Sequence, residues 1–363
     1  MTGAPMIHRV FASLVFGAVA AALVACGGGD GDPAQDPAGA ADPSSSSSGA
    51  SSSSGASSSS GGAAPPGTDA GAPDASRADA SDGATPAYDA ATWMGAIDDG
   101  TSLAALSIPG THESCAHVEP VSGTAKCQSL SLAEQLAAGV RYFDVRCRHL
   151  NDTFEIHHGP IYQQMNFDDV LGAAAAFLKA HPTETLLMSV KEEYTASGDT
   201  RTFEQTFDAY VQKNAAGWLL AEDLPTLAAA RGKIVLVRRF AATTAKGIDA
   251  TKWADDATFS VTGQANLRVQ DQYVVNDTGA KWTAIESLFA EALHGDATTL
   301  YVNYTSGYKP LLLGVPNIGD VSNVIDPKLA DYFTAAPAKA RYGVVAMDFV
   351  DAHHAELVLK KNF

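Results

Sequence analysis

The chain has 363 residues, and its hydrophobic share of 46% is enough for a sizeable core. Acidic residues outnumber basic residues by 41 to 24, and the formal net charge is −17 at pH 7. Because phosphate backbones select basic surfaces, this charge argues against a nucleic acid as a partner. Any phosphate that the chain recognises must therefore be held by a local group of cations.

The first 25 residues have the pattern of an export signal. His8 and Arg9 precede an apolar run, Val10 to Val24, that is too short for a comfortable membrane span. The residues that end at Cys26 also resemble a bacterial lipoprotein signal, whose cleavage leaves an acylated cysteine at the new N-terminus. We expect residues 1–25 to be a lipoprotein signal peptide and Cys26 to carry a lipid anchor. The alternative is an ordinary signal peptide with a chance cysteine.

This leader predicts an exported protein, held as a lipoprotein at the outer membrane or the cell surface, with release to the medium as a further outcome. Residues 26–89 are rich in Ser, Gly, Ala, Pro and Asp and have almost no large apolar side chains. Such a segment cannot offset the entropy of ordering, so we expect a disordered tether. It would hold a folded domain of residues 90–363 away from a membrane surface.

From residue 90 onward, β-rich runs alternate with helical patterns, which is typical of parallel strands joined by crossovers. Eight strands are predicted, at Ala105–Ile108, Arg141–Cys147, Phe154–His158, Thr185–Lys191, Lys233–Arg239, Asn266–Asp271, Leu300–Tyr304 and Gly343–Phe349. Helices are predicted at Ser131–Ala138, Asp168–Lys179, Thr202–Asn214, Trp282–Leu293 and Pro327–Phe333. The pattern indicates an α/β fold, a single irregular (β/α)8 TIM-type barrel preceded by the disordered linker. The barrel is irregular because too few residues separate the second and third strands for a helix.

Active sites of such barrels lie at the C-terminal ends of the strands, and here those ends are polar. They carry His112, Glu113, Asp144, Arg146, His157, His158, Lys191, Glu192, Glu193, Arg238, Arg239, Asp271, Tyr273 and Asp348. Two histidines beside cations suit cleavage of a phosphodiester. One imidazole takes a proton from the attacking hydroxyl, the other gives a proton to the leaving oxygen, and a guanidinium holds the charged oxygens.

Several of these charges have simpler interpretations. His157 and His158 point to opposite faces of a strand, so one of them is expected only to pack or to form hydrogen bonds. Glu192, Glu193 and Arg238 are interpreted as solvated or neighbouring charges. The other histidines, such as His149, lack an ordered motif and are expected at the surface or at caps.

Three cysteines follow Cys26, so an exported protein would keep at least one thiol. Cys115 and Cys127 bracket one loop and are the favoured disulfide pair; three unpaired thiols, Cys147 included, are the alternative.

Six ordered blocks resemble bacterial phosphatidylinositol-specific phospholipase C: LSIPGTHES, GVRYFDVRCR, FEIHHGPIYQ, TLLMSVKEEY, GKIVLVRRF and VQDQY. The resemblance covers Ala104 to Phe349. It implies a distorted barrel and cleavage in which the inositol 2-hydroxyl attacks phosphorus, giving diacylglycerol and inositol 1,2-cyclic phosphate. It also implies a reaction that needs no cofactor and no metal.

The resemblance further implies roles for individual residues. His112 is similar to the general base, His158 to the general acid and Arg146 to the phosphate ligand. Asp348 is similar to the carboxylate that supports the base. Glu113 stands where bacterial members usually carry Asp, next to the first histidine. Positions similar to those that contact the inositol ring are Lys191, Arg239, Asp271 and Tyr273.

The expected partners are phosphatidylinositol, or a glycosylphosphatidylinositol lipid, and a membrane surface. The apolar stretch Tyr308 to Val315 is expected at the mouth, where it either touches lipid or packs under the rim. The chain is expected to be a monomer.

Two alternatives stay open. The first is a metal-dependent glycerophosphodiesterase with His112, Glu113 and Asp144 as ligands, against which Arg146 argues. The second is a non-catalytic surface lipoprotein that binds inositol lipids.

Overall fold

The computed structural model describes residues 88–363. The predicted leader, Cys26 and nearly all of the predicted tether lie outside the described residues. Among residues 88–363, no helix has both the length and the apolar character needed to cross a bilayer.

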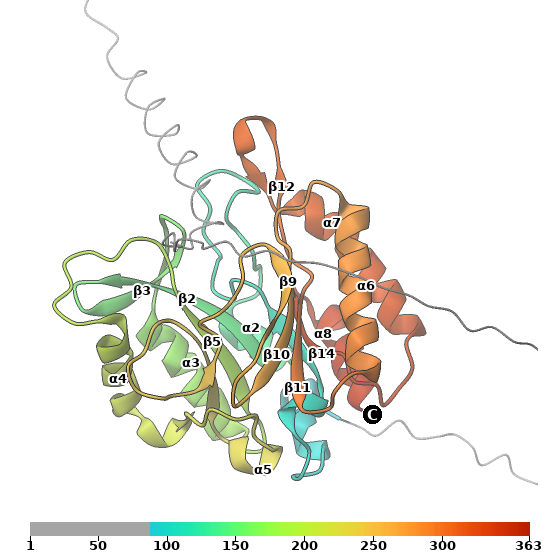
Figure 1. The fold of residues 1–363 in the computed structure, drawn as a ribbon, viewed down its shortest axis with the longest axis horizontal. Helices are drawn as coiled ribbons and strands as arrows, with labels where there is room; N and C mark the ends of the chain where they lie inside the picture. The colour runs from blue at the N-terminus through green and yellow to red at the C-terminus, as the bar shows by residue number, and fades with distance from the viewer. Residues whose placement is uncertain (1–87) are drawn as a thin grey trace, which may run out of the picture. The chain divides into compact units, whose positions relative to one another are not determined.

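The described residues form a curled sheet of 12 strands that confirms the predicted α/β barrel architecture (Figure 1). Its parallel strands follow the order β7-β5-β2-β1-β14-β11-β10. They are β7 (Ile234–Arg239), β5 (Leu186–Glu192), β2 (Tyr142–Leu150), β1 (Ser107–Thr111), β14 (Gly343–Met347), β11 (Thr299–Tyr304) and β10 (Asn266–Asp271).

The two ends of this sheet do not pair with each other among the described residues, so the barrel is open on one side. At one end, β7 pairs in parallel with two short strands, β6 (Trp218–Leu219) and β8 (Ile248–Asp249). At the other end, β9 (Ala257–Val261) runs antiparallel to β10. A separate two-stranded ribbon consists of β12 (Lys309–Pro310) and β13 (Pro316–Asn317).

The third predicted strand is present, but the prediction that it is one of the parallel barrel strands was wrong. β3 (Thr153–His158) runs antiparallel to β2, with Leu150 opposite Thr153, and continues into β4 (Ile161–Asn166). Asn151 and Asp152 join β2 to β3 with φ values of 50° and 59°, as a type I′ hairpin turn requires. Because a hairpin needs no crossover, the missing helix at this point is explained.

Helices cover the outside of the sheet, with α6, α7 and α8 on one flank (Figure 1). The α-helices are α2 (Leu132–Ala137), α3 (Phe167–Ala180), α4 (Phe203–Lys213), α5 (Leu227–Ala230), α6 (Thr278–His294), α7 (Gly319–Ala335) and α8 (Ala352–Leu359). Short 3-10 segments are η1 (Ala90–Ala96), η2 (Leu103–Ala105), η3 (Ala215–Gly217), η4 (Leu312–Gly314) and η5 (Lys360–Asn362). The predicted start of the helix at Pro327 was wrong, because α7 begins at Gly319 and contains this proline.

The alternation of side chains along each strand divides the core into two clusters. On β2, Tyr142 belongs to the cluster inside the curl, whereas Phe143 and Val145 belong to the cluster between sheet and helices. The same alternation holds on β5, where Leu187 faces inward and Met188 faces the helices. Neighbouring residues of a strand point to opposite faces. The side to which a strand-end side chain points can therefore be worked out from the buried apolar residues that precede it.

A buried ion pair fastens the N-terminal segment to the barrel. Arg141 and Glu184 are fully buried, and the Arg141 Nε to Glu184 Oε2 distance is 2.9 Å. The Glu184 carboxylate also accepts hydrogen bonds from the backbone N–H groups of Met94 and Gly95 in η1. The buried charges of Arg141 and Glu184 are thus paired with each other, and the carboxylate has further hydrogen bonds, as a buried ion pair requires.

The favoured disulfide is not formed. Cys115 is a free thiol buried in the outer core cluster, which also contains Cys147. Burial raises the pKa of both thiols above the usual range of cysteine, so they behave as small apolar side chains.

Candidate active site

One spacing rule accounts for most of the predicted site. On each contributing barrel strand, a polar residue lies four positions after an apolar residue of the inner cluster, so both point into the barrel. The pairs are Ile108 and His112, Tyr142 and Arg146, Leu187 and Lys191, Val235 and Arg239, Leu267 and Asp271, and Val344 and Asp348.

Strand register also aligns three of the cations. In the β2–β5 ladder, Arg146 is opposite Lys191, and in the β5–β7 ladder Lys191 is opposite Arg239. The three side chains therefore start at one level across neighbouring strands. This row could bind an anion or the hydroxyl groups of a polar ring.

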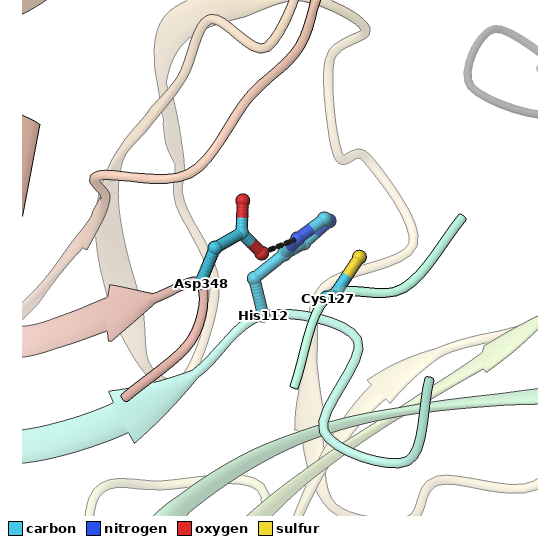
Figure 2. A group of neighbouring side chains, drawn as sticks. All are labelled: His112, Cys127 and Asp348. Carbon is cyan, nitrogen blue, oxygen red and sulfur yellow. Dashed lines mark hydrogen bonds and ion pairs between the residues drawn. The ribbon is translucent and has the colours of Figure 1, made fainter. Parts of the chain in front are cut away.

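His112 follows β1 and contacts the carboxylate that follows β14. Its Nδ1 lies 2.8 Å from Asp348 Oδ1, and its side chain is 13% exposed (Figure 2). The other Asp348 oxygen accepts a hydrogen bond from Gly307 N at 3.3 Å. Since an ionised carboxylate only accepts, Nδ1 carries the proton and Nε2 keeps a lone pair that can act as a base.

His158 ends β3 and is held by a different partner. Its Nδ1 lies 2.7 Å from the carbonyl oxygen of Ala125. A carbonyl only accepts, so Nδ1 carries a proton here as well, and Nε2 is the nitrogen that can exchange a proton with a ligand. The neighbouring His157 is held by Gly159 O at 3.1 Å and by Glu155 at 3.3 Å. Burial lowers the pKa of His157, which fits a structural role.

Arg146 stands at the centre of a buried charge network. Its guanidinium lies 2.8 Å from Glu113 Oε1, 3.1 Å from Asp144 Oδ2 and 3.8 Å from Glu193 Oε2. Burial alone would raise the pKa of Asp144, but Arg146 and Arg239 outweigh it and hold the pKa well below its usual range. Asp144 is therefore ionised, and it fixes the orientation of Arg146 through Nε and Nη2.

Glu113 has the opposite electrostatic balance. Burial raises its pKa to about 8, with Glu193 and Asp144 adding to the shift and Arg146 opposing it. Burial therefore favours the protonated form of this carboxyl, which can donate a hydrogen bond. Its backbone has a φ of 42°, an uncommon conformation for a residue other than glycine.

The interpretation of Glu193 as a solvated charge was wrong. Its side chain is buried, pairs with Lys191 at 3.1 Å and accepts a hydrogen bond from Gly159 N at 3.1 Å. It therefore connects the Arg146 network to the strand end that carries His158. Arg238 is also buried, but on the outer face of β7, where Phe240 O and Lys246 O accept from it. Glu192 is exposed, as expected.

His149 also differs from expectation, because it is buried against Thr206 rather than placed at the surface.

Arg239 and Asp271 are connected through a tryptophan that sequence reasoning missed. The Arg239 guanidinium lies 3.9 Å from the Trp253 ring centre and 3.5 Å from Asp144 Oδ1. The indole N–H of Trp253 donates to Asp271 at 2.9 Å. Trp253 lies in an irregular loop after β8, and no spacing in the sequence pointed to it.

Tyr273 lies apart from the Arg146 network. Its hydroxyl donates to Asp255 at 2.6 Å, and its ring is 6.2 Å from that of Tyr308. Its carbonyl oxygen accepts a hydrogen bond from Tyr308 N at 2.9 Å, so Tyr273 lies next to the start of the β12–β13 ribbon.

The tip of the apolar ribbon is exposed, which excludes for these residues the alternative that the stretch packs under the rim. Leu312 and Leu313 are 86% and 76% exposed, and Leu311 is 43% exposed.

The three ligands of the metal-dependent alternative, His112, Glu113 and Asp144, do not form a group with metal-like spacing among the described residues. Between Glu113 and Asp144 stands the Arg146 guanidinium, which would repel a cation. Within residues 88–363, two groups have metal-like spacing: His112, Cys127 and Asp348, and His149, Asp152 and Asp199.

Comparisons with known proteins identify a family for this chain. The family described as "Phosphatidylinositol-specific phospholipase C, X domain" matches residues 106–240. A Staphylococcus aureus 1-phosphatidylinositol phosphodiesterase is 34% identical over 278 residues, covering 71% of this chain and 87% of the relative. A Listeria monocytogenes protein of the same name is 27% identical over 285 residues, covering 74% of this chain and 84% of the relative.

Solved structures give the same result. A phosphatidylinositol-specific phospholipase C from S. aureus has a TM-score of 0.69 at 31% identity, covering 76% of this chain and 98% of the other. The L. monocytogenes enzyme has a TM-score of 0.61 at 25% identity, covering 76% of this chain and 100% of the other. The chain therefore belongs to the family of bacterial phosphatidylinositol-specific phospholipases C.

Proposed function

We propose that this protein cleaves phosphatidylinositol by attack of the inositol 2-hydroxyl on phosphorus, giving diacylglycerol and inositol 1,2-cyclic phosphate. The observation that carries the proposal is the pair of histidines beside the buried Arg146. Each imidazole has Nδ1 hydrogen-bonded to a protein oxygen, and Nε2 is the nitrogen that we assign to each proton transfer. The relatives named 1-phosphatidylinositol phosphodiesterase support the substrate class.

In this mechanism His112 Nε2 takes the proton of the 2-hydroxyl as the new oxygen–phosphorus bond forms. Asp348 stabilises the imidazolium that results. His158 Nε2 then gives a proton to the glycerol oxygen as its bond to phosphorus breaks. Because the nucleophile belongs to the substrate, the attack has the high effective concentration of an intramolecular reaction.

Arg146 is proposed to hold the non-bridging phosphate oxygens, with Asp144 fixing its orientation. A guanidinium shared among three carboxylates would lose much of its attraction for a phosphate. The raised pKa of Glu113 reduces this competition, because a protonated carboxyl carries no charge. We propose that this neutral Glu113 donates a hydrogen bond towards the leaving oxygen, beside His158.

The inositol ring is proposed to bind along Lys191, Arg239, Asp271 and Tyr273. Charged side chains on both sides of a hydroxyl-rich ring can donate and accept its hydrogen bonds. Free phosphatidylinositol and a glycosylated inositol lipid share this headgroup and are both candidate substrates.

The protein is further proposed to meet the membrane in two ways. Leu312 and Leu313 at the tip of the β12–β13 ribbon would enter lipid, and Cys26 would carry the anchor of an exported lipoprotein. The related phospholipase C of S. aureus binds membranes, which supports the first contact. Stable attachment generally takes two such signals. The catalytic part is proposed to act as a monomer.

Replacing the base tests the mechanism. We expect His112→Asn to lower release of soluble inositol phosphate from phosphatidylinositol vesicles by roughly 10²–10⁴-fold, the usual contribution of a general base. The exposed His353→Asn is the matched control and should keep full turnover. Chelator should leave the wild-type rate unchanged. A rate that chelator abolishes and calcium restores would support the metal-dependent rival, and absence of turnover in folded protein would support a binding role.

The pKa of Glu113 has a consequence for stability. The folded state holds this proton up to about pH 8, whereas an unfolded Glu releases it near its ordinary value of 4.5. The contribution to stability is therefore fully present below pH 4.5 and is lost as pH rises towards 8. Glu113→Gln has no proton to release at this position. Its free energy of unfolding relative to that of wild type should therefore increase by at least about 1 kcal/mol between pH 5 and pH 8.

Urea unfolding at several pH values measures this difference, with the exposed Glu286→Gln as control. A difference between Glu113→Gln and wild type that stays constant from pH 5 to pH 8 would show that Glu113 is ionised throughout.

The ribbon tip is tested by charge insertion. Burying one leucine in lipid is worth about 1.5–3 kcal/mol, so Leu312→Asp should weaken binding to phosphatidylcholine vesicles by about tenfold or more. Val324→Asp places the same charge at an exposed position of α7 and should have little effect. Equal binding by wild type and Leu312→Asp in a sedimentation assay would exclude this contact.

The anchor is tested by labelling cells with a radioactive fatty acid. We expect label on the wild-type protein and none on Cys26→Ser, since the acyl chains attach at this cysteine. Unlabelled wild-type protein would leave an ordinary signal peptide as the correct interpretation.

A further inference from the structure

Cys127 brings a thiol next to His112 and Asp348, and its sulfur also lies 3.7 Å from Ala125 O and 3.9 Å from His158 Nδ1. His112, Cys127 and Asp348 each offer one ligand atom, and these three atoms lie within 4.8 Å of one another (Figure 2). Figure 2 shows the sulfur and the carboxylate both next to the imidazole, with the carboxylate hydrogen-bonded to the ring. The other two cysteines of the described chain, Cys115 and Cys147, lie in the outer core cluster instead.

Hydrogen bonds hold the three residues in this arrangement. The carbonyl oxygen of Cys127 accepts from Phe349 N, next to Asp348, at 2.7 Å. The following residue, Gln128, donates from its side chain to His112 O and to Met347 O, at 2.8 Å each. The loop that carries the thiol is thus fastened to the two strand ends that carry the imidazole and the carboxylate. Preorganisation of this kind lowers the cost of binding a ligand.

We propose that His112, Cys127 and Asp348 form an inhibitory site for a thiophilic divalent cation, of which Zn²⁺ is the type. Nitrogen, sulfur and oxygen are the ligand atoms that zinc takes from proteins, at about 2.0–2.3 Å. Because the three ligand atoms already lie within 4.8 Å of one another, small side-chain movements would bring them around one tetrahedral centre. Three protein ligands leave one position for water or a phosphate oxygen.

The ligand set distinguishes this site from the calcium or magnesium sites of other phosphodiesterases. Those hard cations take oxygen ligands, whereas a thiolate selects softer metals. The bound cation would deprotonate the thiol and carry its charge next to the imidazole. His112 could then no longer accept a proton, so occupancy of the site would stop turnover.

The inhibitory consequence depends on the proposed catalytic role of His112, but the existence of the site does not. Its test is therefore a spectrum of the full chain with Co²⁺ as the probe. Thiolate coordination gives a charge-transfer band in the near ultraviolet, which the alternative group of His149, Asp152 and Asp199 cannot give because it has no sulfur. We expect this band in the wild type.

Matched substitutions assign the band to one thiol. In a Cys26→Ser background, which removes the thiol outside the described residues, Cys127→Ala should lose the band and Cys115→Ala should keep it. In the vesicle assay, inhibition of each variant is measured relative to its own metal-free turnover, because Cys127 also contacts His158. The Zn²⁺ concentration for half-inhibition of Cys127→Ala should rise on the order of tenfold or more, since losing even an outer-shell partner costs 10–100-fold in metal affinity.

Three results would overturn the proposal. The first is a wild-type cobalt spectrum without the band, a result that does not depend on the folding of any variant. The second is a band that persists in Cys127→Ala in the Cys26→Ser background. The third is equal inhibition of wild type and Cys127→Ala by Zn²⁺. If the protein shows no turnover, the proposed function fails and the cobalt spectra still decide the site.

Discussion

The buried guanidinium of Arg146 is the interaction on which the site depends. It stands on β2 among carboxylates from the loop after β1 (Glu113), from β2 itself (Asp144) and from the end of β5 (Glu193). Removing one partner of a buried pair leaves an uncompensated charge, which typically costs about 3–5 kcal/mol. The network therefore keeps three strand ends at one level above the core. The same Asp144 also contacts Arg239, so the order reaches β7.

Much of this arrangement was predictable from the sequence, because it repeats the strand period. Once Ile108 or Val344 is assigned to the interior, the residue four positions later must face the same way, which places His112 and Asp348 at one mouth. The choice of Arg239 over Arg238 follows from the same rule. Residue type then suggests the chemistry, since histidines, guanidinium and carboxylates match the needs of phosphodiester cleavage.

The features that were missed depend on contacts between segments that no local pattern encodes. Trp253 joins Arg239 to Asp271 from an irregular loop, and Glu193 is buried only because Arg146 and Lys191 surround it. The thiol of Cys127 lies next to His112 and Asp348 because of the fold of its loop, which the strand spacing does not predict. The hairpin that carries His158 was also missed, but here a local pattern did exist. The Asn151-Asp152 pair between two β-rich runs is a recognisable turn signal.

The position of the cations explains how so acidic a protein can bind an anionic lipid headgroup. At physiological ionic strength, charges on an exposed surface are screened over about 8 Å, so most of the net charge of −17 acts weakly at the mouth. Arg146, Lys191 and Arg239 begin at one register level and are largely shielded from solvent, where screening is weak. Their carboxylate partners compensate them before a ligand arrives. Affinity for a phosphate then depends on directed hydrogen bonds and on how much charge those partners leave uncompensated, which gives the protonation of Glu113 its importance.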